Sequence, residues 1–377
     1  GTGSDVVSAG LVQGLVLREG HVGFSLDVAP ERGAAMEPVR RACEEAVRKL
    51  PGILSVTAVL TAHRPAAKGG HQPHDHSHAG HSHAGHSHDD HSQGPARAAP
   101  QAGPLRLPGV AAIVAVASGK GGVGKSTVAV NLALGLAALG RRVGLLDADI
   151  YGPSVPRMLG LKGKPEMDPA SGDKKLKPME KYGLKAMSIG FFIEDDAPVV
   201  WRGPMVQSAL TQMMTDFSWG PLDVLIVDMP PGTGDAQLTM AQRVPLAGAV
   251  IVSTPQEIAL IDARKALAMF EKTHVPVLGV IENMAYFVSP GSGEKSYIFG
   301  QGGARRMAEK AGCDFLGEVP LHMSVRETSD AGTPIVATAP DSEEARIFIE
   351  IARRVGEHID ASLGQQARKA PKITIEN

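Results

Sequence analysis

The sequence predicts an α/β protein: a doubly wound domain with a mostly parallel sheet, preceded by a small α+β domain. From residue 109 onward apolar runs alternate with helical ones, and most apolar runs lack polar alternation, as in parallel strands covered on both faces. Residues 66–108 are rich in Ala, Gly, Pro, His and Ser, which is typical of a flexible linker. We therefore expect a small domain over residues 1–65, a linker over 66–108 and a larger domain over 109–377.

The expected elements follow from the period of the apolar residues. In the first domain two strand-like runs, a helical run and a third strand-like run cover residues 11–17, 22–28, 34–50 and 53–61. The larger domain has strand candidates at residues 112–117, 142–147, 223–228, 247–253, 277–282 and 314–319. Helices over 126–139 and 258–272 lie between them, and a last helix over 343–359 is expected to pack on the domain.

The composition excludes several classes of protein. Of the 377 residues 43% are hydrophobic and 21% charged, so two or three domains with buried cores are expected. A net charge of −2 gives no electrostatic footprint for nucleic acid, and no run of roughly 18–20 apolar residues is present to cross a membrane. Because there are two cysteines and no export signal, we expect a reducing cytoplasm.

A phosphate-binding loop stands between the first strand of the larger domain and its first helix. Gly119-Lys-Gly-Gly-Val-Gly-Lys-Ser126 fits the pattern G-x-x-x-x-G-K-[ST], which defines a P-loop NTPase domain. The backbone N–H groups of such a loop converge on phosphate oxygens at a helix N-terminus. We expect Lys125 to reach the β- and γ-phosphates, Ser126 to ligate Mg²⁺ and Thr127 to contact the α-phosphate. The backbone contacts are expected from Gly119, Lys120, Gly121, Gly122, Val123 and Gly124.

Carboxylates end two further buried strands. Asp228 closes the run Asp223-Val-Leu-Ile-Val-Asp228, where it is placed to hold Mg²⁺ through water. Asp149 is the candidate that orients the attacking water. Asp147 is expected either to ligate Mg²⁺ or to hydrogen-bond to the residues that do, and the alternative is that it only caps a helix or ends the strand. Gly232, in the turn after Asp228, is expected to donate its backbone N–H near the γ-phosphate.

The position of Lys120 and seven motifs identify the chain as similar to known ATPases. A lysine directly after the first loop glycine resembles the deviant Walker A loop of the SIMIBI ATPases. That resemblance implies a dimer in which Lys120 is a catalytic residue that crosses to the partner's nucleotide; otherwise it is a solvated surface lysine. The motifs that resemble the Mrp/ApbC family are Gly119–Thr127, Asp147-Ala-Asp-Ile-Tyr-Gly-Pro-Ser154, Trp201-Arg-Gly-Pro-Met205, Asp228-Met-Pro-Pro-Gly-Thr-Gly-Asp235, Glu282-Asn-Met284, Phe299-Gly-Gln-Gly-Gly303 and Arg326-Glu-Thr-Ser-Asp-Ala-Gly-Thr-Pro334.

The family resemblance implies an iron–sulfur cluster carrier that uses ATP and Mg²⁺. Members hold a [4Fe–4S] cluster across a homodimer and pass it from scaffold proteins to apo-protein clients, with no role for nucleic acid or membrane. The resemblance also implies that Asn283, Pro320 and Leu321 contact adenine, although Asn283 could instead bond to loop backbone. Residues 5–65 resemble the small iron–sulfur-assembly domain of bacterial members. Thr2-Gly-Ser-Asp-Val-Val7 resembles the early Thr-Gly-x-Asp segment of that domain, which favours Gly1–Ser4 as native rather than as a cloning remnant and implies a domain without its first helix.

The chain departs from this family at the cluster ligands. The family has Cys-Pro-x-Cys after its Glu-Asn-Met motif, whereas this chain has Ser289 and Ser292 at the two cysteine positions. Iron–sulfur clusters are held by thiolates, and a hydroxyl is a poor substitute. The serines are either natural or deliberate substitutions. Cys43 and Cys313 are expected to be small buried side chains, so cluster binding by this chain is in doubt.

Two other functions are compatible with parts of the sequence. Nine of the 14 histidines lie between His71 and His91, where imidazoles with Asp75, Asp89 and Asp90 can chelate Zn²⁺, Ni²⁺ or Co²⁺. The tract is either a spacer or part of a nickel or zinc metallochaperone, although such NTPases read guanine through a motif that is absent at residues 282–285. A MinD/ParA-type positioning ATPase is the other alternative, distinguished by membrane or DNA binding in the ATP state.

Overall fold

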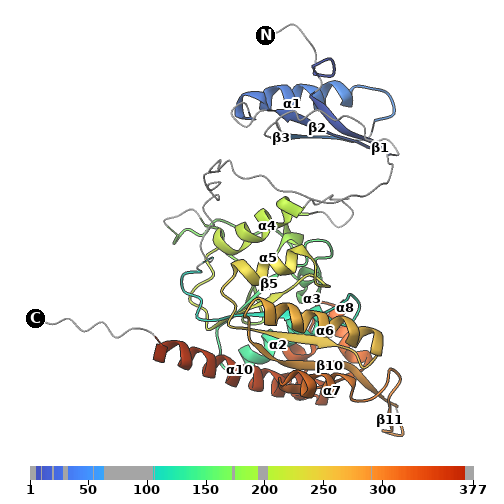
Figure 1. Ribbon diagram of the computed structural model, residues 1–377, viewed down its shortest axis with the longest axis vertical. Helices are drawn as coiled ribbons and strands as arrows, with labels where there is room; N and C mark the ends of the chain where they lie inside the picture. Colours follow the sequence, from blue (N-terminus) through green and yellow to red (C-terminus); the bar gives the residue numbers. More distant parts are fainter. Residues whose placement is uncertain are drawn as a thin grey trace, which may run out of the picture. The chain divides into compact units, whose positions relative to one another are not determined.

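The computed structural model describes two compact units, residues 1–94 and 95–377 (Figure 1). Within them the described residues are 6–9, 11–18, 21–28, 33–53, 55–62, 105, 107–171, 175–193, 203–289 and 291–369. The histidine tract and most of the predicted linker lie outside this part of the chain.

The first unit has the predicted β-β-α-β order. Its elements are β1 (Val12–Arg18), β2 (His21–Val28), α1 (Gly33–Arg48) and β3 (Ser55–Ala62). Strand β2 pairs antiparallel with β1 and parallel with β3. Alternate residues of β2 and β3 are buried, and Cys43 and Val47 of α1 pack against them. One face of this sheet is therefore covered by the helix, as the alternating pattern requires.

The second unit is built on a nine-stranded sheet that is mostly parallel. The order is β11-β10-β9-β4-β8-β5-β7-β6, with β12 paired to β10. Among the described strands of this sheet, only β11 and β6 run antiparallel to their neighbours. The strands are β4 (Ile113–Ala117), β5 (Val143–Asp147), β6 (Met179–Lys181), β7 (Leu184–Ser188), β8 (Val224–Asp228), β9 (Gly248–Ser253), β10 (Val277–Val288), β11 (Lys295–Ser296) and β12 (Phe315–Leu321). The predicted fold class is confirmed, and all six strand candidates form strands.

Helices cover both faces of this sheet. Val114 and Val116 of β4 pack with α2 and α10, while Ile113, Ala115 and Ala117 pack with helices of the opposite layer. This double burial explains why the central strands lack polar alternation. The longer helices are α2 (Lys125–Ala138), α4 (Gly203–Thr215), α5 (Asp235–Arg243), α6 (Glu257–Lys272), α7 (Gly303–Ala311), α8 (Met323–Asp330) and α10 (Glu343–Lys369); the short ones are α3 (Val155–Leu159) and α9 (Ile335–Thr338).

The last helix packs on the domain, as predicted, but it is longer. Its buried residues include Phe348, Ala352 and Val355, and α2 approaches so closely that a Cβ on Gly135 would lie 2.8 Å from that of Ala352. Helix α10 continues to Lys369 rather than ending at residue 359. Among the described residues no helix is both long and apolar enough to cross a membrane.

Candidate nucleotide-binding site

The predicted phosphate site lies at one edge of the sheet. Strands β4, β8 and β5 are parallel neighbours, and Asp228 pairs in register with Val116 on one side and with Asp147 on the other. Their carboxyl ends therefore meet, which is where α/β sheets bind ligands. The loop 118–124 joins the end of β4 to α2 at this edge.

Two glycines of the loop are required by their surroundings. A Cβ on Gly119 would lie 2.0 Å from the carbonyl carbon of Asp262 in α6, so no side chain fits there. Gly124 has φ 78°, a left-handed conformation, and caps α2 directly before Lys125. The loop thereby directs the free N–H groups of the first turn of α2 toward the phosphate position.

Lys125 lies among the predicted carboxylates. Its Nζ is 2.5 Å from Asp228 Oδ1, 3.9 Å from Asp149 Oδ2 and 3.3 Å from Ser126 Oγ. Lys125 is 6% exposed and Asp228 fully buried, so the ammonium compensates a carboxylate that has no access to water. Four predicted residues are thus brought together.

The donor set fits magnesium. Asp228 Oδ2 is buried and has no hydrogen-bond partner among the described residues. A carboxylate oxygen and the nearby Ser126 hydroxyl are the hard oxygen donors that Mg²⁺ takes, usually together with several waters. These two residues would hold the ion when nucleotide is bound.

Asp147 is engaged by the protein on both of its oxygens. Oδ1 accepts from the backbone N–H of Asp149, and Oδ2 accepts from the N–H groups of Ser154 and Val155 and from the Ser188 hydroxyl, at 2.9–3.2 Å. The geometry favours the predicted role behind the ligands, because Asp147 caps α3 and fixes the backbone of Asp149. Direct Mg²⁺ ligation by Asp147 stays a prediction.

Burial raises the pKa of both carboxyls at the end of β5, Asp147 in the strand and Asp149 just after it. Desolvation, followed by the charge of Asp228, raises the pKa of Asp147 to about 7. Desolvation also raises the pKa of Asp149, against the effect of Lys125. Asp149 keeps 14% of its side chain exposed, so it is accessible to water in the site.

The middle of β10 is tied to the phosphate loop through Asn283. Asn283 is 6% exposed, and its Nδ2 donates to the Val123 carbonyl at 2.8 Å. This is the loop contact that was the alternative to adenine binding. Pro320 and Leu321 end β12, which pairs with β10. Their contact with adenine stays a prediction.

Gly232 and Lys120 lie on the two segments that face the phosphate position. The N–H of Gly232 donates to the Ser118 carbonyl at 3.0 Å, and the Ser118 hydroxyl donates to the carbonyl of Lys120. Within the part of the chain that the structure describes, the Lys120 ammonium forms no ion pair within 4.0 Å of a carboxylate.

Ser289 and Ser292 lie in the hairpin that joins β10 to β11. The N–H of Ser289 donates to Glu294, and the Ser292 hydroxyl accepts from the Glu294 N–H. Both free cysteines are partly buried, and burial raises the pKa of each thiol. Among the described residues no three His, Cys, Asp or Glu side chains gather as a metal site. The hairpin itself offers two hydroxyls and no thiolate, so its residues do not fit the ligand set of a [4Fe–4S] cluster.

Two buried polar residues near the site were not predicted. Glu282 is 1% exposed, and its carboxylate accepts the N–H groups of Gly302 and Ala304 at the start of α7. The position of Glu282 in the Glu-Asn-Met motif was the sequence feature that could have pointed to it. Gln237 of α5 is equally buried and donates to the Pro230 carbonyl.

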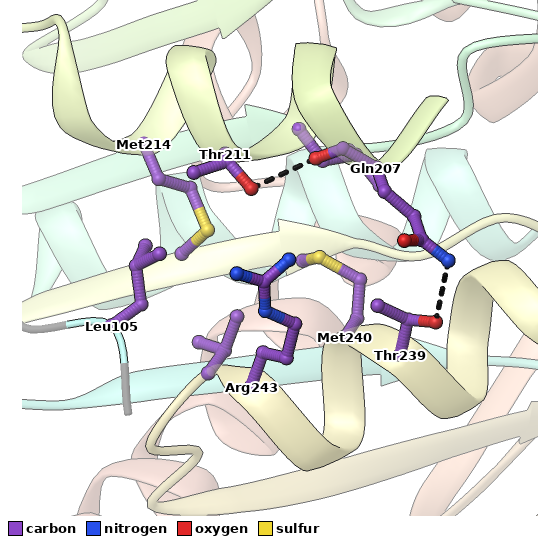
Figure 2. Close-up of a pocket in the computed structure, with 9 residues that line it drawn as sticks. Leu105, Gln207, Thr211, Met214, Thr239, Met240 and Arg243 are labelled. Carbon is purple, nitrogen blue, oxygen red and sulfur yellow. Dashed lines mark hydrogen bonds between the residues drawn. The ribbon is translucent and has the colours of Figure 1, made fainter. Parts of the chain in front are cut away.

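A small, mostly apolar pocket separates α4 from α5. Figure 2 shows Met214 and Met240 lining it, with Gln207 reaching across to Thr239 and the Arg243 side chain directed into it. The hydrogen bond from Gln207 Nε2 to Thr239 Oγ1 measures 3.1 Å. It ties α5 to α4.

The parallel sheet, the glycine loop and the Lys125–Asp228 pair define a P-loop NTPase. Residues 109–356 match the sequence model described as the NUBPL iron-transfer P-loop NTPase, within the ParA group, and the chain belongs to that family. Residues 1–60 match the model of an iron–sulfur cluster assembly protein. The family resemblance of the sequence is confirmed in both units.

Curated relatives and a solved structure agree with this. An Arabidopsis thaliana iron–sulfur protein required for mitochondrial NADH dehydrogenase is 55% identical over 252 residues, 67% of this chain and 80% of that one. The iron–sulfur cluster carrier protein of Aquifex aeolicus is 52% identical over 259 residues, covering 68% and 71%. A nucleotide-binding protein from Archaeoglobus fulgidus, solved with ADP, is 40% identical with a TM-score of 0.54, covering 62% of this chain and 90% of that one.

Proposed function

We propose that this protein binds and hydrolyses ATP and acts in the transfer of iron–sulfur clusters to apo-proteins. The observation that carries the proposal is the Lys125–Asp228 pair with Asp149 beside it, in a chain whose family is defined by iron transfer. Two free cysteines favour work in a reducing compartment, the cytoplasm.

The residues of the site have distinct roles in hydrolysis. Lys125 leaves Asp228 for the β- and γ-phosphates, where its charge offsets that of the transferring phosphoryl group. Asp149 orients the attacking water, and the backbone of Asp149 is held by Asp147. Ser126 and Asp228 would hold Mg²⁺, which would supply positive charge against the phosphate oxygens.

We further propose a homodimer in which Lys120 reaches the nucleotide of the partner. The support is that Lys120 lies in the phosphate loop itself and that, among the described residues, its ammonium forms no ion pair within 4.0 Å, although its charge, after the hydrogen bond from Lys265, helps to lower the pKa of Asp262 in α6. In this arrangement the ATP sandwiched between two copies is held by Lys125 of one copy and by Lys120 of the other. Dimerisation then depends on ATP rather than on ADP.

The cluster is cargo in this proposal, and the hairpin is not its holder. Ser289 and Ser292 offer hydroxyls where the family pattern has thiolates, and a hydroxyl, being far more basic, is a poor ligand for the iron of such a cluster. We thus assign ATP binding and hydrolysis to this chain, and we do not assign cluster ligation to its hairpin.

Two variants test the nucleotide part. Lys125→Ala should abolish ATP hydrolysis and ATP-dependent transfer of a cluster to an apo-protein with a [4Fe–4S] site. Lys310→Ala, which changes an exposed lysine of α7, is the matched control and should leave both rates unchanged. An unchanged hydrolysis rate in Lys125→Ala would refute the site assignment.

A further inference from the structure

One buried side chain beneath the phosphate site is used by no step of hydrolysis described above. Gln237 is 1% exposed, and its Nε2 donates to the Pro230 carbonyl. Its Oε1 is also buried but has no hydrogen-bond partner among the residues that the structure describes. The orientation of the amide is set by Pro230, because a carbonyl can only accept. An unsatisfied buried acceptor is costly, so an arrangement that satisfies it is favoured.

The turn above Gln237 is the one that meets the γ-phosphate. The Gly232 N–H, the proposed phosphate donor, is occupied here by the Ser118 carbonyl at 3.0 Å. A single N–H in good geometry cannot serve both acceptors. Binding of the γ-phosphate therefore requires residues 231–234 to rearrange, whereas ADP makes no such demand.

Both ends of this turn are fixed. Met229 donates its N–H to the backbone of β4 at 3.0 Å. On the other side, Gln207 of α4 holds Thr239 of α5 (Figure 2). We expect the change forced by the γ-phosphate to lie mainly in residues 231–234, which directly precede α5 and its first-turn residue Gln237.

We propose that Gln237 is a positioning residue that makes the turn respond to the γ-phosphate. When ATP is bound, Oε1 accepts a hydrogen bond from the backbone N–H of Thr233 or Gly234. The hydrogen bond from Gln237 to Pro230 is present with either nucleotide, so it does not contribute to the difference in binding free energy between ATP and ADP. The additional hydrogen bond to Oε1 forms only with ATP and therefore favours ATP binding over ADP binding. This inference rests on the proposed ATP-dependent function and specifies how the γ-phosphate is sensed.

The test compares affinities for a non-hydrolysable ATP analogue and for ADP by calorimetry. Gln237→Met keeps the size of the side chain and removes both polar atoms. We expect its preference for the analogue over ADP to fall about fivefold, the value of one net hydrogen bond, with ADP affinity within about twofold of the unchanged chain. Gln242→Met changes an exposed glutamine of the same helix and should alter neither affinity.

Equal losses for both nucleotides, as from a merely structural role, would overturn the inference, and so would an unchanged preference. A second measurement needs no variant: hydrogen exchange of the Thr233 amide or of the Gly234 amide, whichever donates to Oε1, should be slower with the analogue than with ADP. Equal exchange rates would also count against it. If the unchanged chain bound no ATP analogue at all, the proposed function would fail together with the inference.

Discussion

Removing the Lys125 side chain should destabilise the nucleotide-free protein as well as stop hydrolysis. Lys125 Nζ lies 2.5 Å from Asp228 Oδ1, and the second oxygen of that fully buried carboxylate has no partner among the described residues. In Lys125→Ala the carboxylate keeps no compensating charge in contact. Breaking one side of a buried ion pair costs about 3–5 kcal/mol. For a domain of this size that lowers Tm by about 6–20 °C.

The assay is thermal unfolding of the nucleotide-free protein, with a rescue variant. Adding Asp228→Asn to Lys125→Ala removes the uncompensated charge, so Tm should recover most of the loss while hydrolysis stays absent. Lys310→Ala serves again as the exposed-lysine control. If Lys125→Ala melts within about 2 °C of the unchanged chain, or if Asp228→Asn brings no recovery, the ion-pair reasoning is wrong.

Three further predictions concern the same edge of the sheet. Gly119→Ala should lower the free energy of unfolding by about 3 kcal/mol or more, because the new Cβ would meet the Asp262 backbone at 2.0 Å. Gly121→Ala is the control: a Cβ there would have no atom nearer than 4.0 Å, so the free energy of unfolding should change by less than about 1 kcal/mol. Both values are measured by urea titration. The folded pKa of Asp147, about 7, lies above its ordinary value of 3.8, so the folded state binds the proton more tightly. The contribution of Asp147 to the free energy of unfolding is therefore complete below about pH 4 and is lost as the pH rises to 7. Urea titrations across this pH range should show that decrease, and Asp147→Asn should reduce it. ATP should be hydrolysed in preference to GTP, and a GTP preference would favour a metallochaperone instead.

The parts of the fold that could be predicted depend on local sequence. The strand, glycine loop and helix around Lys125 are contiguous, and buried parallel strands such as β8 stand out as continuous apolar runs. Strand β7 was missed because Leu184–Ser188 contains polar residues and is short. The end of α10 was placed too early, since the apolar period stops near residue 359 while good helix formers continue.

The parts of the site that could not be predicted depend on pairing between distant segments. The chemistry of Lys125, Asp228 and Asp149 followed from motif positions. The engagement of Asp147 by Ser188 did not, because it requires β7 beside β5. The unsatisfied oxygen of Gln237 is likewise a property of packing, and no local pattern marks it.

The claim that separates this chain from the pattern of its family is that it has the nucleotide machinery without hairpin thiolates. Anaerobic reconstitution with iron and sulfide, followed by iron and sulfide analysis, tests it on the unchanged chain and on Ser289→Cys/Ser292→Cys. We predict no stable cluster on the unchanged chain and a cluster on the double variant. A stable cluster on the unchanged chain, at the same stoichiometry as on the variant, would contradict the account.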